Sequence, residues 1–185
     1  FVESNGSFDW TAFDTYKNGA RGSENDDGTA TNLSAARARA FHYVISAHDI
    51  KIPGRFTRSG QDEFTSGISR GLGASDFIVA LAEWNNGGTV EQQAGTFMHE
   101  LGHNLGLSHG GGADLATNNK PNYLSVMNYL FQMRGLRING KDSHFDYSRF
   151  ELPSLDENSL SEPSGLGNTP PAGYGTRYYV GDNVR

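Results

Sequence analysis

Cysteine is absent from the 185 residues of this chain. The absence excludes thiol nucleophiles, disulfide frameworks and metal sites built from thiolates. It also leaves the fold to be held by a hydrophobic core, with the help of a metal ion if one is bound. A chain of 185 residues is long enough to bury such a core, so we expect residues 1–185 to form a single domain.

Basic residues are few, because 15 Lys and Arg stand against 21 Asp and Glu and give a net charge of -6. No basic cluster is present, so the charge argues against nucleic acid as a partner. Long apolar runs are also missing, which argues against a membrane span. The chain begins at Phe1 without a signal peptide, and we therefore expect a mature or trimmed form.

Glycine, by contrast, is frequent, and its 24 residues indicate many turns and loops. Between these turns, the apolar pattern predicts helices over residues 8–18 and 33–41 and strands over residues 42–47 and 75–84. Residues 161–176 have the composition of a loop.

The clearest predicted helix begins after Gly88. Thr89 and Gln92 have the spacing of a capping box, in which each side chain accepts a hydrogen bond from the other residue's backbone. One apolar stripe follows at helical spacing: Ala94, Phe97, Met98, Leu101 and Leu105. We expect the helix to pack by this stripe and to present its opposite side, which carries His99 and His103.

Residues 99–110, HELGHNLGLSHG, contain three of the six histidines. His99 and His103 lie four apart, one above the other on a helix, where both imidazoles can reach one tetrahedral zinc ion. His109 can reach the same ion only if the helix ends and the chain turns back. Gly106 lies midway and accepts a positive φ without steric cost. The sequence therefore predicts a zinc site made by His99, His103 and His109.

Glu100 follows the first of these histidines directly and lies beside the metal rather than on it. A general base needs that position to take a proton from an activated water. Other zinc proteases that share the HExxH pattern take a carboxylate roughly twenty residues further on as the third ligand. Between residues 104 and 141 the one carboxylate is Asp114, close behind His109 in a glycine-rich segment. The alternative ligand set is therefore excluded.

Residues 99–109 carry the pattern HExxHxxGxxH, and residues 125–129 (SVMNY) follow as a methionine turn. In both features the chain resembles the metzincin metalloproteases. The resemblance covers residues 75–131. It extends more weakly over residues 145–160, which look like the lower lobe of secreted bacterial members, and so it implies a secreted, extracellular protein. Gly110 differs from the residue typical of the best-known branches, and the branch stays open.

The resemblance implies an α+β fold, with a twisted, mixed five-stranded sheet and the active-site helix in an upper lobe over about residues 1–106. A small irregular lower lobe is implied over about residues 107–185. An extended substrate is expected to pair with the strand at about residues 75–84, at the edge of the sheet. We expect the protein to be a monomer.

The resemblance also implies roles for two residues of the methionine turn. Met127 is expected to form an apolar base beneath the three imidazoles. Tyr129 lies two residues further on, where a tyrosine in related branches reaches the zinc ion and donates a hydrogen bond to the tetrahedral intermediate.

Together these features predict a zinc-dependent endopeptidase that hydrolyses internal peptide bonds with metal-activated water and Glu100 as general base. One alternative is a zinc-stabilised peptide-binding module without catalysis, against which the presence of Glu100 argues. Another is a structural domain whose metal serves folding; such zinc sites normally have four protein ligands, and Tyr129 is the one evident fourth. A calcium ion is a further expectation, at residues 23–28 or around Asp156 and Glu157.

Overall fold

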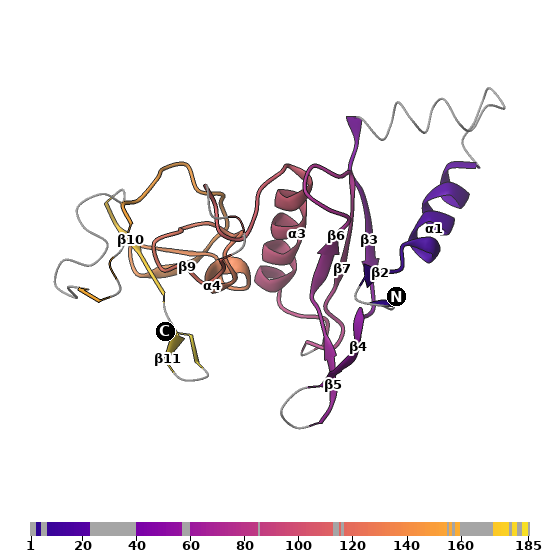
Figure 1. Ribbon diagram of the computed structural model, residues 1–185, viewed down its shortest axis with the longest axis horizontal. Coiled ribbons are helices and arrows are strands. Elements are labelled where there is room, and N and C mark those ends of the chain that lie inside the picture. Colours follow the sequence, from indigo (N-terminus) through magenta and orange to yellow (C-terminus); the bar gives the residue numbers. More distant parts are fainter. Residues whose placement is uncertain are drawn as a thin grey trace.

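The computed structural model places the active-site helix predicted from the sequence between two groups of elements (Figure 1). The structure describes residues 3–4, 7–22, 40–56, 60–84, 86–112, 115, 117–154, 156, 158–159, 172–177, 179–180 and 183–184. The predicted loop at residues 23–28 and all but the last two residues of the predicted helix over 33–41 lie outside this part.

The first elements are a short antiparallel pair, β1 (Glu3–Ser4) and β2 (Ser7–Phe8), and the helix α1 (Thr11–Gly22). The helix begins three residues later than its apolar pattern predicts, because the Asp9 carboxylate accepts a hydrogen bond from the backbone N–H of Thr11 at 2.9 Å. Phe13 of α1 is fully buried and anchors the helix on the first core cluster.

The central sheet has three strands in the order β3-β7-β6: β3 (Tyr43–Ala47), β7 (Asp76–Ala80) and β6 (Gly67–Ser69). β3 runs parallel to β7 and β6 runs antiparallel to it. β4 (Lys51–Phe56) and β5 (Asp62–Phe64) form a separate antiparallel pair.

The prediction of one five-stranded sheet is therefore wrong for the described part of the chain, although the α+β class and the mixed sheet are confirmed. β4 and β5 pair with each other instead of joining the central sheet, and the register of this pair shifts between Ile52 and Phe56. Pro53 and Gly54 occupy this irregular stretch, where a missing N–H and a missing side chain interrupt a regular ladder.

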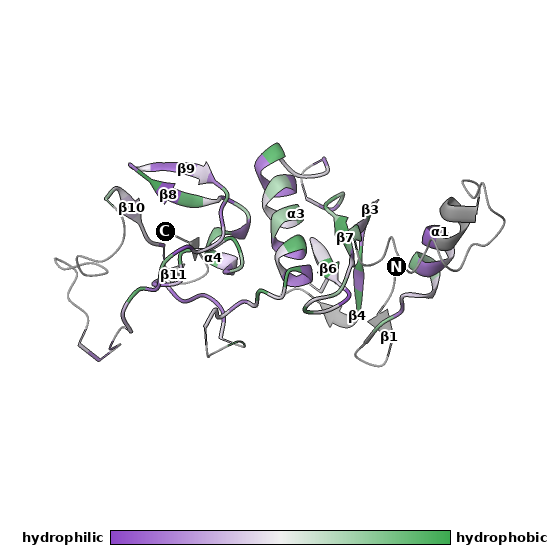
Figure 2. Cartoon of the chain, turned by 90° about the horizontal axis from the view of Figure 1, so that it is seen from above, coloured by the Kyte–Doolittle hydropathy of each residue, from purple (hydrophilic) through white to green (hydrophobic). Residues whose placement is uncertain are grey.

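The prediction that residues 75–84 form the sheet edge is also wrong. β7 lies between β3 and β6, and all five of its residues are buried. A continuous apolar run such as Phe77–Ala80 is typical of a strand covered on both faces, and Figure 2 colours β7 as hydrophobic. In the described residues the edges of this sheet are β3 and β6, and β6 is the one that contacts α3.

The helix α3 (Val90–Asn104) begins with the predicted capping box: Thr89 N donates to Gln92 at 2.8 Å, and Gln92 N donates to Thr89 at 3.3 Å. The predicted apolar stripe is only partly buried. Leu101 packs on the cluster of Phe77, Val79 and Leu81, whereas Phe97 is 43% exposed and Leu105 is 55% exposed.

The buried positions of α3 lie instead on its histidine side: Gly95, Thr96, His99, Glu100, Gly102 and Asn104. The reason is that α3 lies between two layers (Figure 1). Elements that follow it cover Gly95 and Gly102, and β6, which precedes it, lies against Glu100 and Asn104. At Gly95 and Gly102 the opposing layer comes so close that an added Cβ would overlap the Gln132 carbonyl oxygen and the Met127 sulfur. Glycine is therefore required at both positions.

The opposing layer contains the short helix α4 (Tyr129–Gln132) and three strands in the order β10-β8-β9: β8 (Leu136–Ile138), β9 (Lys141–His144) and β10 (Tyr174–Gly175). It has a buried cluster of its own: Leu124, Leu130, Phe131, Leu136 and Leu152. A last short pair joins β11 (Tyr179–Val180) to β12 (Asn183–Val184). None of the described helices combines the length and the apolar character that crossing a membrane requires.

Candidate metal centre

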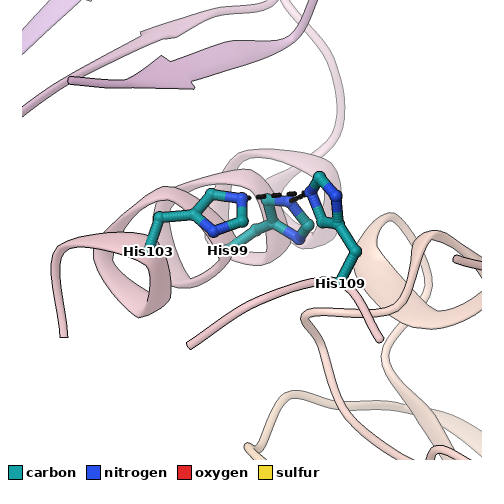
Figure 3. Close-up of side chains that lie close together, drawn as sticks. All are labelled: His99, His103 and His109. Carbon is teal, nitrogen blue, oxygen red and sulfur yellow. Dashed lines mark hydrogen bonds between the residues drawn. The ribbon is translucent and has the colours of Figure 1, made fainter. Parts of the chain in front are cut away.

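Three imidazoles converge beside α3 (Figure 3). The Nε2 atom of His109 lies 3.1 Å from Nε2 of His99 and 3.1 Å from Nε2 of His103. Two nitrogens bound to one tetrahedral zinc ion at about 2.0–2.1 Å are themselves roughly 3.3 Å apart. The spacing of the three nitrogens therefore fits one zinc-sized ion and leaves a fourth position open.

Backbone carbonyls fix the orientation of two of these rings. Nδ1 of His99 lies 2.9 Å from the carbonyl oxygen of Val126, and Nδ1 of His103 lies 2.9 Å from that of Leu107. A carbonyl only accepts, so each Nδ1 carries the proton and donates it. Each Nε2 then has a free lone pair directed at the shared point, which is the tautomer that a metal ligand needs.

The turn after α3 brings the third histidine back, as the sequence predicts. Leu105 is the C-cap of α3, and Gly106, the residue after it, has a φ of 89°. Gly106 N donates to the His103 carbonyl at 2.9 Å and Leu107 N donates to the Gly102 carbonyl at 2.8 Å, which is the Schellman pattern. The same turn places the Leu107 carbonyl against His103.

Burial keeps the histidines neutral at pH 7. It lowers the pKa of His99 to about 3 and that of His109 to about 4, and it also lowers the pKa of His103. Three neutral imidazoles whose lone pairs face one point repel one another unless a cation lies between them. The donor set thus fits a divalent metal ion of borderline softness such as zinc.

Glu100 lies next to this centre but outside it. The ligand atoms that lie within 4.8 Å of one another belong to His99, His103 and His109, and Glu100 is not among them. The residue is 5% exposed. Burial raises the pKa of Glu100 to about 8, and the backbone N–H of Ser69 nearby acts in the opposite direction.

The predicted methionine turn is present at residues 125–128, closed by a hydrogen bond from Asn128 N to the Ser125 carbonyl at 3.0 Å. Met127 is fully buried and its sulfur lies against Gly102 of α3. Tyr129 is 47% exposed, and its ring centroid lies 4.7 Å from that of His109 and 5.4 Å from that of His99. The structure thus places Tyr129 beside two of the imidazoles and Met127 against the helix that carries His99 and His103.

Residues 14–110, which include most of α1, the central sheet, α3 and all three histidines, match the Metallo-peptidase family M12B Reprolysin-like. The chain belongs to this family. Its membership makes the reprolysin-like protein a metallopeptidase, and the three histidines of its HExxHxxGxxH motif are the zinc-binding triad. No curated protein and no solved structure gave a match.

Sequence reasoning missed several groups that hold the reprolysin-like site. The Val126 and Leu107 carbonyls carry no residue-type signal, because any residue has a carbonyl. Gly95 and Gly102, in contrast, are a signal that the sequence contains. Glycines seven residues apart share a helix face and indicate the close approach of another element.

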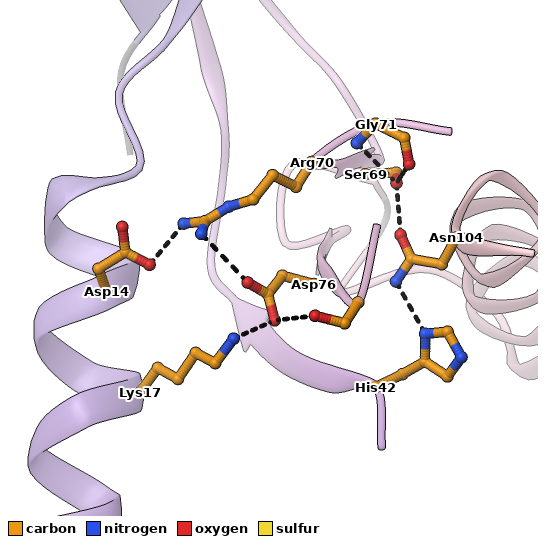
Figure 4. Close-up of polar contacts among 9 residues, drawn as sticks. Asp14, Lys17, His42, Ser69, Arg70, Gly71, Asp76 and Asn104 are labelled. Carbon is orange, nitrogen blue, oxygen red and sulfur yellow. Dashed lines mark hydrogen bonds and ion pairs between the residues drawn. The ribbon is translucent and has the colours of Figure 1, made fainter. Parts of the chain in front are cut away.

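Asn104 is one of these groups: it is the last residue of α3, and its side chain connects the helix to the sheet (Figure 4). It lies 2.6 Å from Ser69 Oγ and 3.2 Å from His42 Nδ1. With the amide turned to satisfy all its neighbours, it also pairs with the backbone N–H and C=O of Asp76 at 3.1 and 3.2 Å. Asn104 thereby fixes the end of α3 that carries His103.

One further group within the described residues has metal-ligand atoms within 4.8 Å of one another: His48, Asp49 and Glu83. His48 and Glu83 are exposed, and His48 pairs with Asp49 at 2.8 Å. The calcium site expected at residues 23–28 lies outside the described part of the chain, as does Glu157. Asp156 accepts a hydrogen bond from Asn158 N within a local turn at 3.0 Å, and nothing supports calcium there.

Proposed function

We propose that this metallopeptidase is a zinc-dependent endopeptidase that cuts internal bonds of extended protein segments. The observation that carries the proposal is a triad of neutral imidazoles aimed at one point, with a buried carboxylate on the same helix outside the ligand set. A structural zinc site would use a fourth protein ligand. The groups of His, Cys, Asp and Glu found among the described residues include none beside this triad.

A bound zinc ion supplies Lewis acidity, which polarises the scissile carbonyl and lowers the pKa of an attacking water toward about 7. Glu100 accepts the proton of that water as it attacks. The same carboxyl then donates the proton to the departing amide nitrogen, so that the peptide bond breaks without an acyl-enzyme. Burial in a nearly dry position raises its pKa and makes Glu100 able to hold this proton between the two steps.

The substrate is proposed to lie along β6. Ala80 N donates to Ser66 O at 2.7 Å and Arg70 N donates to Asp76 O at 2.9 Å, so alternate residues of β6 face β7. The backbone groups of Gly67 and Ser69, which lie between them, face the free edge. An extended peptide that adds to this edge passes the carboxylate of Glu100, which would explain a preference for unfolded or loop segments.

Tyr129 is proposed to assist the reaction and Met127 to support the ligands. The Tyr129 ring lies tilted beside those of His109 and His99 and is half exposed, so its hydroxyl can turn toward a bound substrate and donate a hydrogen bond to the developing oxyanion. Met127 packs against α3 at Gly102, the residue before His103.

The proposal also keeps three expectations from the sequence: one catalytic domain over residues 1–185, a monomer, and secretion. Sedimentation of the purified chain tests the first two, because a monomer with one unfolding transition is expected. Detection of the protein in the culture medium of its source organism tests the third.

Glu100→Gln separates the endopeptidase from a peptide-binding module without catalysis. We expect the variant to hold zinc as the parent does and to cleave an unfolded protein such as casein at least 10³-fold more slowly, since it keeps the ligands and loses the base. Mass spectrometry of the digest and the zinc content of both proteins are measured. A variant with full zinc and parental activity would contradict the assignment of the base.

A further inference from the structure

We propose that β6 holds the general base in place: Gly67 leaves the space that Glu100 occupies, and the Ser69 N–H fixes its carboxylate. The inference rests on the proposed role of Glu100 and adds two positioning residues to it. Both belong to the strand on which the substrate is proposed to lie.

The space above Glu100 exists because residue 67 has no side chain. A Cβ at Gly67 would lie 2.8 Å from Cγ and 2.8 Å from Oε1 of Glu100, and 2.8 Å from the Ile78 carbonyl oxygen. Real Cβ atoms do not approach so closely, so a side chain would push aside both the Glu100 carboxylate and the Ile78 carbonyl of β7. Gly67 is not among the residues with positive φ, so its backbone conformation alone does not require glycine.

The backbone N–H of Ser69 lies on the outward side of β6. Because Ser66 and Arg70 bond to β7, the N–H of Ser69 points away from β7 toward the free edge, from where, in this proposal, it donates to the Glu100 carboxylate. Strand addition would otherwise use this donor. One outward group of the edge strand thus serves the base instead of the substrate.

A second contact holds the same strand against the next turn of α3. Ser69 Oγ lies 2.6 Å from the Asn104 side chain, and Asn104 is four residues after Glu100 (Figure 4). β6 is therefore attached to α3 at two points, one turn apart. A substrate bound along β6 then has a fixed position relative to the base, which is the geometry that a proton transfer requires.

The first test is a double-mutant cycle on the zinc-loaded protein. We expect Gly67→Ala to lower kcat about tenfold to a hundredfold with KM within about twofold, because a base displaced by about 1 Å transfers its proton poorly. In a Glu100→Ala background, Gly67→Ala should lower the residual rate by a much smaller factor, since the contact with the Ile78 carbonyl remains but no carboxylate is left to be displaced. Equal losses in both backgrounds would overturn the proposal.

The matched control is Gly175→Ala, a glycine replaced in a strand away from the site. Its Cβ would meet Arg137 Cδ at 3.4 Å, an ordinary contact, and its φ is not positive. We expect parental kcat and KM for this variant. Zinc affinity, measured by competition with a chelator, should be the same in the parent, Gly67→Ala and Gly175→Ala.

The second test needs no activity and no Gly67 variant. Hydrogen exchange of the Ser69 amide, followed by NMR in the zinc-loaded protein, should be at least tenfold faster in Glu100→Ala than in the parent, because its acceptor is gone. The Arg70 amide, which bonds to β7, should exchange at the parental rate. An unchanged Ser69 rate in an inactive Glu100→Ala protein would overturn the positioning role alone, whereas an active Glu100→Ala protein would overturn the base itself.

Discussion

At the scale of single residues, the metal centre depends on keeping three imidazoles neutral and correctly turned. Burial lowers their pKa values, and the Val126 and Leu107 carbonyls choose the tautomer. The identity of the ligands could be predicted from the sequence, since spacings of four and six with Gly106 between them suit one ion. The two carbonyls could not, because backbone groups leave no trace in residue type.

The raised pKa of Glu100 predicts how the free energy of unfolding of the metal-free protein changes with pH. Its pKa is about 8 in the folded state and near 4.5 when unfolded, so between these values the folded state holds a proton that the unfolded state lacks. Its contribution to stability is present below pH 4.5 and is lost as pH rises through 8. Relative to Glu100→Gln, the free energy of unfolding of the parent should fall by up to about 1.4 kcal/mol per pH unit in this window.

Urea unfolding of the parent and Glu100→Gln in the presence of a chelator, from pH 5 to pH 8, measures this difference. A difference that stays constant with pH would mean that Glu100 is charged in the folded state throughout.

At the scale of elements, α3 and the turn behind it form one unit, in which the helix end sets the third ligand. The capping box, the helix and its glycine stop are local features, and the sequence predicted all three. The prediction that α3 packs only by its apolar stripe was wrong, because the sides of a helix that become buried depend on which other elements pack against it. Gly95 and Gly102 admit the opposing layer on the histidine side, while Phe97 and Leu105 stay largely exposed.

Gly106→Ala tests this unit. With φ at 89°, alanine is strained there, and we expect a loss of about 1 kcal/mol in stability together with weaker zinc binding, because the Leu107 carbonyl that orients His103 moves. Gly60→Ala is the control: its φ is 78° and its surroundings are open, so it should cost similar stability and leave zinc affinity unchanged. Chemical unfolding and chelator competition measure the two effects, and parental zinc affinity in Gly106→Ala would contradict the account.

At the scale of the whole molecule, α1, the sheet and α3 are joined by charges that no local pattern predicts. Asp76 is 2% exposed and pairs with Lys17 at 2.5 Å and with Arg70 at 3.2 Å, and Arg70 also reaches Asp14 (Figure 4). The error about the sheet edge has the same origin, because strand order depends on pairings far apart in the sequence. The apolar run of β7 predicts a central strand, but the sequence does not show which strands pair with it and so form the edges of the sheet.

Asp76→Asn should destabilise the protein by about 3–5 kcal/mol, because two cations, one of them the buried Lys17, lose their partner. Arg149→Ala, which removes an exposed pair with Asp146, should change stability by about 1 kcal/mol or less. Thermal and urea unfolding compare the two variants. Equal, small effects would show that the buried charges contribute little to joining α1 to the sheet.

The central claim is that one zinc ion held by His99, His103 and His109 makes this chain a peptidase. Its most direct test is to add zinc stepwise to the metal-free protein and to follow the cleavage of an unfolded protein. The account predicts no cleavage without metal and a rise that ends at one equivalent of zinc, with no rise in His109→Ala. Full cleavage by the metal-free protein, or none after one zinc ion has bound to the three histidines, would contradict it.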